Sequence, residues 1–311
     1  KTRTNKTVWV FTAVYFGIVI CAFLCYWLSG MSPFDAINHA FAVTATGGFS
    51  TKNLSIASFG SPLINIVTIF FMFISSIHFG IIYMVFASRS LKPLNNPVLK
   101  FYAGTILVAA LLVAFSLKMS SAGFTWGESF MTGFFQVVSS ISTTGFAISD
   151  NNTWPLFACI ITVLITVPCG MAGSTTGGIK MDRMLLMFKS VGQQVKSSMH
   201  PSSINQVHIG NHMLGNNEIY PHVVFIGLYF ITIAASMALT ILSGMDVQNS
   251  LASSISCLSN VGPAMESAGT MGNYSGVPVL AKIVFIVDMF LGRVEIYPVL
   301  AVVTMAFNGR K

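Results

Sequence analysis

Three short segments that contain glycine each lie between two long apolar runs of the sequence. They read ATGGFS at residues 45–50, STTGFA at residues 142–147 and LSNVGPA at residues 258–264, and we call them the glycine loops. Non-helical backbone is tolerated at membrane depth only where it is buried in protein or lines a water-filled cavity. Three such loops in equivalent places therefore predict one structural element repeated around a pore.

The composition is that of an integral membrane protein. Only 8% of the residues are charged and the mean hydropathy is +0.75, whereas a soluble domain carries about 25% charged residues. The expected membrane spans are residues 8–29, 61–87, 98–117, 155–189, 220–242 and 277–307. Three further apolar stretches are too short to cross a bilayer and are expected to form re-entrant helices. They cover residues 33–44, 126–142 and 246–258.

The cationic residues sort by membrane side. Twelve of them fall on one side of the expected spans and only two, Lys52 and Lys118, on the other. The twelve are Lys1, Arg3, Lys6, Arg89, Lys92, Lys100, Lys180, Arg183, Lys189, Lys196, Arg310 and Lys311. Because positive charge accumulates on the cytoplasmic side, the N-terminus is expected there. The net charge of +7 does not indicate nucleic-acid binding, since these cations do not share one soluble face.

Each short helix begins with helix-start signals. Ser32 offers a capping hydroxyl, Pro33 suits the first helical position, and Asp35 follows. The other two starts repeat the hydroxyl and the acid, as Thr125 with Glu128 and Ser243 with Asp246. Each loop has one glycine that aligns with those of the other two, namely Gly48, Gly145 or Gly262. The acid precedes this aligned glycine by 13, 17 and 16 residues, so the first short helix should be one turn shorter, or its cap is assigned wrongly. The C-termini would point to the membrane centre, where their negative dipole ends stabilise a cation.

The glycine loops supply the candidate ion ligands. Glycine adopts positive φ at little cost and can turn carbonyl groups inward, and rings of backbone carbonyls can replace the hydration shell of an ion. The candidate potassium ligands are Thr46, Gly47, Gly48, Thr143, Thr144, Gly145, Asn260, Val261 and Gly262. Each loop has one aligned glycine and lacks the two of the TVGYG loop of potassium channels. We therefore expect fewer coordination sites and weaker rejection of sodium.

The loop motifs carry a family resemblance. ATGGFS, STTGFA and SNVGPA, in this order and between paired spans, resemble filters two, three and four of the Trk/Ktr/HKT potassium transporter superfamily. GMAGSTTGGIK at residues 170–180 is similar to the intramembrane loop of that superfamily, and LGRVEIY at residues 291–297 is similar to its last-helix signature. The resemblance extends over essentially the whole chain and is closest to the bacterial TrkH branch.

The resemblance implies an all-α polytopic membrane protein. Its units, each a span, a pore helix, a filter loop and a second span, would surround a pseudo-fourfold pore axis. Three of four units would be present, at residues 1–95, 96–200 and 201–311, as in a fragment that lacks the first unit. The implied function is potassium uptake across the bacterial inner membrane, with potassium as the transported ion, no organic cofactor and no enzymatic activity. The implied partners are membrane lipid, a second copy in a homodimer, and a cytosolic nucleotide-binding subunit of the TrkA type.

The fourth expected span is interrupted between Pro168 and Gly178, where proline and glycine weaken the helix. The resemblance makes this interruption an intramembrane gate, and a static kink is the alternative. The candidate gate residues are Gly170, Gly173, Ser174, Thr175, Thr176, Gly177, Gly178 and Arg293. A charge at bilayer depth is costly, so Arg293 should face the cavity beneath the filter and meet the interruption. A structural pair with Asp288 or Glu295 is the alternative.

Two other functions compete with a potassium pathway. A secondary transporter for another cation or a small solute would also use broken helices, but it would not require three like-oriented helix–loop units. An intramembrane hydrolase could use Ser174 with His78 or His222, which would need to lie within hydrogen-bond reach. No G-x-S-x-G motif accompanies Ser174. The polar segment 196–219 is the expected docking surface for a cytosolic subunit.

Overall fold

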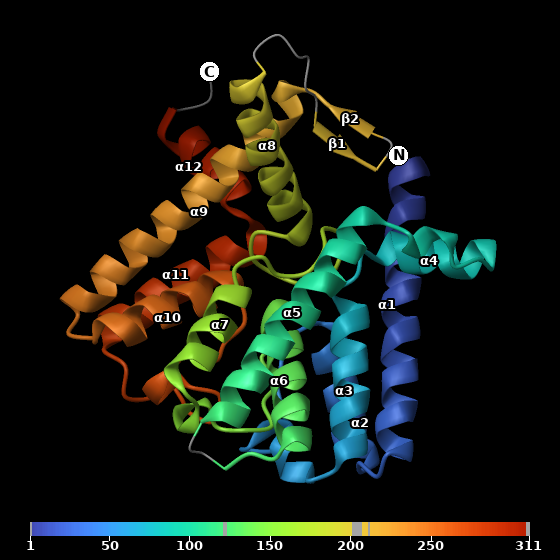
Figure 1. Ribbon diagram of the computed structural model, residues 1–311, viewed down its shortest axis with the longest axis vertical. Coiled ribbons are helices and arrows are strands. Elements are labelled where there is room, and N and C mark those ends of the chain that lie inside the picture. The colour runs from blue at the N-terminus through green and yellow to red at the C-terminus, as the bar shows by residue number, and fades with distance from the viewer. Residues whose placement is uncertain (1, 121–122, 201–206, 211, 309–311) are drawn as a thin grey trace.

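The computed structural model describes residues 2–120, 123–200, 207–210 and 212–308. Its helices form three consecutive repeats (Figure 1). The N-terminal repeat holds α1 (Thr2–Leu28), α2 (Pro33–Thr44), α3 (Pro62–Ser75) and α4 (Phe79–Ser88). The middle repeat holds α5 (Pro97–Met119), α6 (Trp126–Ile141), α7 (Leu156–Ile165) and α8 (Met181–Met199). The C-terminal repeat holds α9 (Asn216–Leu242), α10 (Val247–Ser259), α11 (Val279–Val294) and α12 (Ile296–Asn308).

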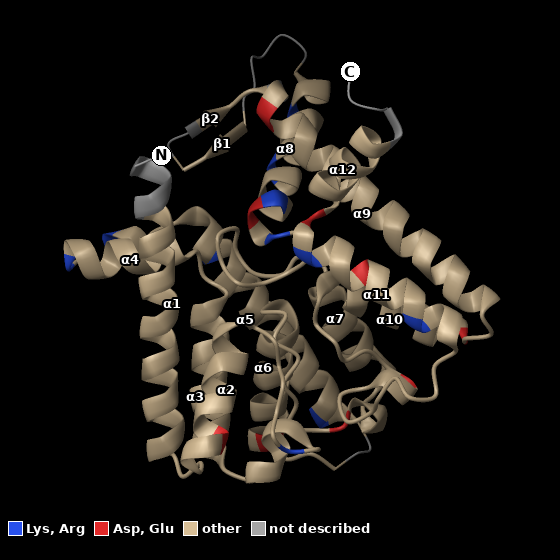
Figure 2. Ribbon diagram, turned by 180° about the vertical axis from the view of Figure 1, so that it is seen from behind, with Lys and Arg blue, Asp and Glu red and all other residues tan. Residues whose placement is uncertain are grey.

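Short elements complete the fold. Four 3-10 helices lie in the connections, at Ser55–Phe59, Lys92–Leu94, Asn151–Thr153 and Glu266–Ala268. An antiparallel hairpin between α8 and α9 pairs β1 (Val207–Ile209) with β2 (His212–Leu214), with Val207 opposite Leu214. This hairpin is a small addition to the expected all-helical class. Charged residues are few along the spans and gather around α8 and the turns at the opposite end (Figure 2).

Among the described residues, α1, α5 and α9 are long and apolar enough to cross a membrane, and a fourth span results if α3 and α4 count as one. The expectation of an unbroken span over 61–87 is wrong, because α3 and α4 are bent by 96°. The expected span 277–307 is likewise two helices, which separate at Glu295 with a φ of 68°. Only the interruption of span 155–189 was expected, and α7 and α8 flank it.

The break between α3 and α4 is tolerated at membrane depth because another segment satisfies its backbone groups. The partner is the interruption between α7 and α8, residues 166–180, which we call the interrupting segment. Met171 N donates to Ser76 O at 2.9 Å, and Phe79 N donates to Gly173 O at 3.1 Å. Thr175 Oγ1 donates to Ser75 O at 3.2 Å. Two interrupted spans therefore complete each other's hydrogen bonds.

The three short helices α2, α6 and α10 form as expected, with one corrected start. Ser32 and Thr125 are the N-caps of α2 and α6, but α10 is capped by Asp246, whereas Ser243 ends α9. The aligned glycine therefore follows its cap by 16 residues in the outer repeats and by 20 in the middle repeat. The middle helix is one turn longer, rather than the first one being shorter.

The short helices carry the beginnings of the glycine loops into the protein interior, whereas Phe49 and Gly262 remain exposed. Residues 135–141 of α6 and 252–259 of α10 are all buried, as are Val43 and Thr44 at the end of α2. The surrounding spans expose their apolar outer faces, for example at Leu107 and Val108 of α5, as lipid contact requires. The helix ends that lead into the glycine loops are thus enclosed by protein.

Candidate ion-conduction site

All three short helices end in the same turn, which is a Schellman motif. In each turn, the N–H of one residue donates to the carbonyl oxygen three residues earlier in the chain. The N–H of the next residue donates to the carbonyl oxygen five residues earlier. The first set of bonds is Thr46 N to Val43 O (3.3 Å), Thr143 N to Ser140 O (3.1 Å) and Asn260 N to Cys257 O (3.1 Å). The second set is Gly47 N to Ala42 O (2.8 Å), Thr144 N to Ser139 O (3.0 Å) and Val261 N to Ser256 O (3.0 Å). The shared bonds make the glycine loops equivalent in local structure.

The backbone conformation of the three loops also alternates in the same way. Each glycine loop contributes three consecutive candidate ligands. The first and third of these residues have positive φ, whereas the middle residue does not. The φ values are 51° and 65° at Thr46 and Gly48, 54° and 81° at Thr143 and Gly145, and 61° and 101° at Asn260 and Gly262. Alternation of this kind turns successive peptide groups to one side. A threonine with positive φ is strained by about 1–3 kcal/mol and persists only where its surroundings hold it.

The glycine loops contact one another in a fixed succession. A methyl group added at Gly48 would lie 1.9 Å from Thr144 O, and one added at Gly145 would lie 2.2 Å from Val261 O. Gly48 and Gly145 thus each pack against the carbonyl group of the middle residue in the next loop. Gly262 occupies the equivalent place in the third loop but has no atom of the described chain within 4 Å of such a methyl group. The succession joins the first loop to the second and the second to the third, and it ends at Gly262.

The interrupting segment lies against the starts of all three loops. Thr175 Oγ1 donates to Thr44 O at 2.9 Å, and Thr46 Oγ1 donates to Thr175 O at 3.0 Å. Gly177 N donates to Thr143 Oγ1 at 3.1 Å. A methyl group at Gly177 would lie 2.5 Å from Ser259 O. The residues predicted as gate and those predicted as filter therefore form one contiguous assembly.

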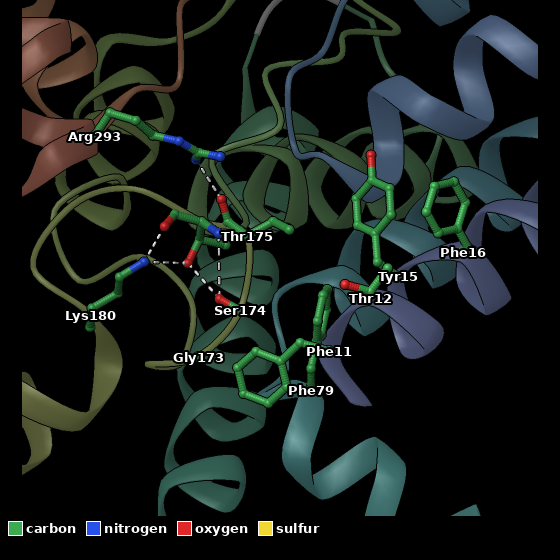
Figure 3. A pocket seen from close by; sticks show the side chains of 11 residues that line it. Phe11, Thr12, Tyr15, Phe16, Phe79, Gly173, Ser174, Thr175, Lys180 and Arg293 are labelled. Atoms are coloured by element: carbon green, nitrogen blue, oxygen red, sulfur yellow. Dashed lines mark hydrogen bonds between the residues drawn. The ribbon is translucent and has the colours of Figure 1, made fainter. Parts of the chain in front are cut away.

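A cavity of about 640 Å³ opens beside the interrupting segment (Figure 3). Arg293 reaches the segment here, where its Nη1 donates to Thr175 O at 2.6 Å. The expected contact is therefore present. Neither alternative partner of Arg293 pairs with it, since Asp288 accepts from Ser236 and Glu295 pairs with Arg183. Aromatic rings from α1 and α4 line the far side of the cavity, among them those of Phe11, Tyr15 and Phe79.

A second anchor connects the exit of the interrupting segment to the α11–α12 break. Arg183 Nη2 lies 2.7 Å from Glu295 Oε2, and the guanidinium of Arg183 also lies 4.1 Å from the centre of the Phe225 ring. Lys180, the last residue of the interrupting segment, donates to Thr176 O and has a φ of 73°. The α11–α12 break therefore contacts the segment through Arg293 and the start of α8 through Glu295.

Sequence reasoning missed the residues of the α3–α4 break. Ser75, Ser76 and His78 interrupt an apolar run, and that polar cluster was the available signal. Ser174, proposed as a nucleophile, donates instead to Met171 O at 2.6 Å and accepts from Thr176 Oγ1 at 2.8 Å. Its hydroxyl is thus engaged within the interrupting segment rather than by a histidine.

Comparison with known proteins gives one consistent result. The family model "TrkH: Cation transport protein" matches residues 2–308. The Trk system potassium uptake protein TrkH of Escherichia coli K12 is 33% identical over 310 residues, which cover 98% of this chain and 62% of that protein. TrkG of the same strain is 30% identical over 301 residues, covering 96% of this chain and 60% of that protein.

A solved structure is also similar. The crystal structure of the potassium transporter TrkH from Vibrio parahaemolyticus superposes with a TM-score of 0.89 at 30% sequence identity. The match covers 98% of this chain and 65% of that one. The chain thus spans about three fifths of the length of these curated relatives.

Proposed function

Since the chain belongs to the TrkH family of cation transport proteins, we propose that it takes part in potassium uptake across the bacterial inner membrane. The observation that carries this proposal is the succession of glycine loops, in which Gly48 packs against Thr144 O and Gly145 against Val261 O. Backbone carbonyl groups gathered in this way can replace water around a potassium ion. The negative dipole ends of α2, α6 and α10 would add to the stabilisation of the ion.

The proposed pore contains a fourth loop. The two glycines that have a following loop each touch its middle carbonyl, whereas Gly262 has no such neighbour among the described residues. A fourth unit would place a carbonyl against Gly262 and a glycine against the middle carbonyl of the first loop. On this basis we propose that residues 1–95, 96–200 and 201–311 act as the second, third and fourth units. The greater length of the relatives fits this arrangement.

The proposed gate is the part of the interrupting segment from Gly170 to Gly178. It contacts all three glycine loops, and Arg293 donates to its Thr175 carbonyl. A segment in this position blocks ions when it lies across the pathway and admits them when it moves aside. Arg293 places a positive charge beside the pathway, which raises the barrier to a cation.

The proposed assembly has its N-terminus in the cytoplasm, as the distribution of Lys and Arg favours. The chain would be surrounded by lipid and would pair with a second copy. The segment 196–219 would bind a cytosolic nucleotide-binding subunit of the TrkA type. Residues 201–206 and 211 of that segment lie outside the described residues.

The test is uptake by reconstituted protein. The chain is joined to the part of the Escherichia coli relative that it does not match, and the completed transporter is placed in proteoliposomes. We expect saturable uptake of ⁸⁶Rb⁺ that excess potassium inhibits and that needs no sodium gradient. Uptake driven only by a sodium gradient would favour the secondary transporter instead. No uptake by a correctly folded completed transporter would contradict the proposal.

A further inference from the structure

Two of the three glycine loops are held by a serine hydroxyl of their own short helix. Ser139 Oγ donates to Phe146 O at 2.6 Å, and Ser256 Oγ donates to Pro263 O at 2.6 Å. Each serine stands six residues before the aligned glycine, and each accepted carbonyl belongs to the residue just after that glycine. Both serines are buried. The hydroxyl therefore fixes the peptide group that follows the glycine.

The N-terminal repeat lacks this serine. The equivalent position is Ala42, whose carbonyl accepts from Gly47 N in the shared turn but whose side chain has no hydroxyl. Phe49, the residue after the aligned glycine, is 81% exposed, whereas its counterpart Phe146 is fully buried. The peptide group after Gly48 therefore lacks the hydroxyl bond that fixes its counterparts in the other two loops.

His39 contacts another part of the first glycine loop. Its Nδ1 lies 2.7 Å from Asp35 O and its Nε2 lies 2.9 Å from Ser50 Oγ. A carbonyl oxygen can only accept, so Nδ1 carries the proton and donates to Asp35 O. Nε2 of the neutral ring then accepts from the Ser50 hydroxyl. The ring thus connects the first turn of α2 to the second residue after Gly48.

The same ring reaches the next loop. His39 stacks on Phe146, with ring centroids 5.7 Å apart and an interplanar angle of 25°, and it meets the edge of Phe59 at 5.3 Å. Phe146 is the residue whose carbonyl Ser139 holds. The side chain of His39 is fully buried. His39 therefore positions the first loop and supports the second, which no other residue of α2 does among the contacts described here.

We propose that His39 is a positioning residue for ion selectivity, which holds the first glycine loop where the other loops use a serine. This inference rests on the proposed function, because it assumes that the loop coordinates potassium. Selectivity between potassium and sodium depends on how ion-facing carbonyls are placed and how freely they move. Loss of the His39 bond to Ser50 should therefore change selectivity more than it changes folding.

The experiment compares variants of the completed transporter by the ability of sodium to compete with ⁸⁶Rb⁺ uptake. We expect His39→Gln and Ser50→Ala each to lower the preference for potassium over sodium by about tenfold, the effect of one lost hydrogen bond. Ala42→Ser in the His39→Gln background should restore much of the preference, because it installs the hydroxyl used by the other two repeats. Asn38→Ala, a change at an exposed neighbour on the same helix, is the control.

The outcomes separate this inference from the proposed function. If the unmodified transporter takes up ⁸⁶Rb⁺ and the His39→Gln and Ser50→Ala variants keep its selectivity, the inference is overturned while the function stands. If selectivity falls but Ala42→Ser restores none of it, His39 does not act by holding the loop, and the inference is again overturned. If the unmodified transporter takes up no ⁸⁶Rb⁺, the proposed function itself fails.

Discussion

The guanidinium of Arg293 donates a hydrogen bond to the carbonyl oxygen of Thr175 at 2.6 Å. Arg293 lies in the last turn of α11 in the C-terminal repeat, and Thr175 belongs to the interrupting segment of the middle repeat. The same threonine contacts the first glycine loop and the α3–α4 break through its side chain and carbonyl. Thr175 is thus the point where all three repeats meet.

Removal of the Arg293 charge should increase ion flux. In the completed transporter, Arg293→Ala removes a cation beside the pathway and leaves Thr175 O with its hydrogen bond from Thr46 Oγ1. We expect ⁸⁶Rb⁺ uptake to rise by roughly tenfold, equivalent to a barrier lowered by about 1.4 kcal/mol. Lys282→Ala removes a charge of the same sign from the other end of α11 and should leave uptake near its original rate. Unchanged uptake in Arg293→Ala at normal protein levels would contradict this role.

Addition of a methyl group at Gly48 should disrupt the contact between the first two glycine loops. Gly48→Ala places Cβ 1.9 Å from Thr144 O, whereas at Gly60 nothing lies within 4 Å, although the two glycines have similar φ values of 65° and 57°. Gly60→Ala therefore costs only the strain of an alanine with positive φ, about 1–2 kcal/mol. We expect Gly48→Ala to abolish ⁸⁶Rb⁺ uptake and Gly60→Ala to retain it. Equal uptake by the two variants would show that the loops do not need this contact.

The ion pair between Arg183 and Glu295 should contribute measurably to stability. Glu295→Gln weakens a pair 2.7 Å long in which the Arg183 side chain is only 16% exposed. We expect a loss of about 1–2 kcal/mol, detected as a lower thermal unfolding midpoint in detergent. Lys52→Gln breaks the ion pair between Lys52 and Asp35, in which the two atoms are 3.6 Å apart and the lysine side chain is 46% exposed. This change should lower the free energy of unfolding by less than about 0.5 kcal/mol. A larger loss from Lys52→Gln than from Glu295→Gln would reverse this ranking.

Asp35 should make stability depend on acid pH. Hydrogen bonds from Thr51 and Ser32 lower the pKa of Asp35 below its usual value, with a smaller contribution from Lys52. A carboxyl with a lowered folded-state pKa stabilises the protein above its ordinary pKa, and this stability is lost as the pH falls through the lowered value. We therefore expect Asp35→Asn to be less stable than the unmodified chain at pH 7. The difference should shrink toward pH 3 in thermal unfolding, and a constant difference would argue against the linkage.

The glycine loops and short helices could be predicted from the sequence because their signals are local. Hydroxyl caps such as Ser32 and Thr125 start the helices, and the aligned glycines adopt positive φ in the loops that follow them. The start of α10 was misassigned because both Ser243 and Asp246 are residues that cap helices well. Local signals therefore identified the elements and left the choice between two adjacent caps open.

The breaks after Ser75 and at Glu295 were not predicted, and distant residues stabilise both. Met171 and Gly173 satisfy the backbone of the first break, and Arg183 pairs with the carboxylate at the second. Neither break has a proline or glycine at its centre. The role proposed for His39 likewise could not be predicted, because it depends on Ser50 and Phe146 being brought to it by the fold.

The central claim is that neutral carbonyl groups of the glycine loops bind the transported cation. The most direct measurement is anomalous scattering from crystals of the completed transporter grown with thallium in place of potassium. We predict anomalous density at the centre of the loop assembly, beside the carbonyl groups of Gly47, Thr144 and Val261. Thallium density found only elsewhere, with the three loops folded as described, would contradict the account.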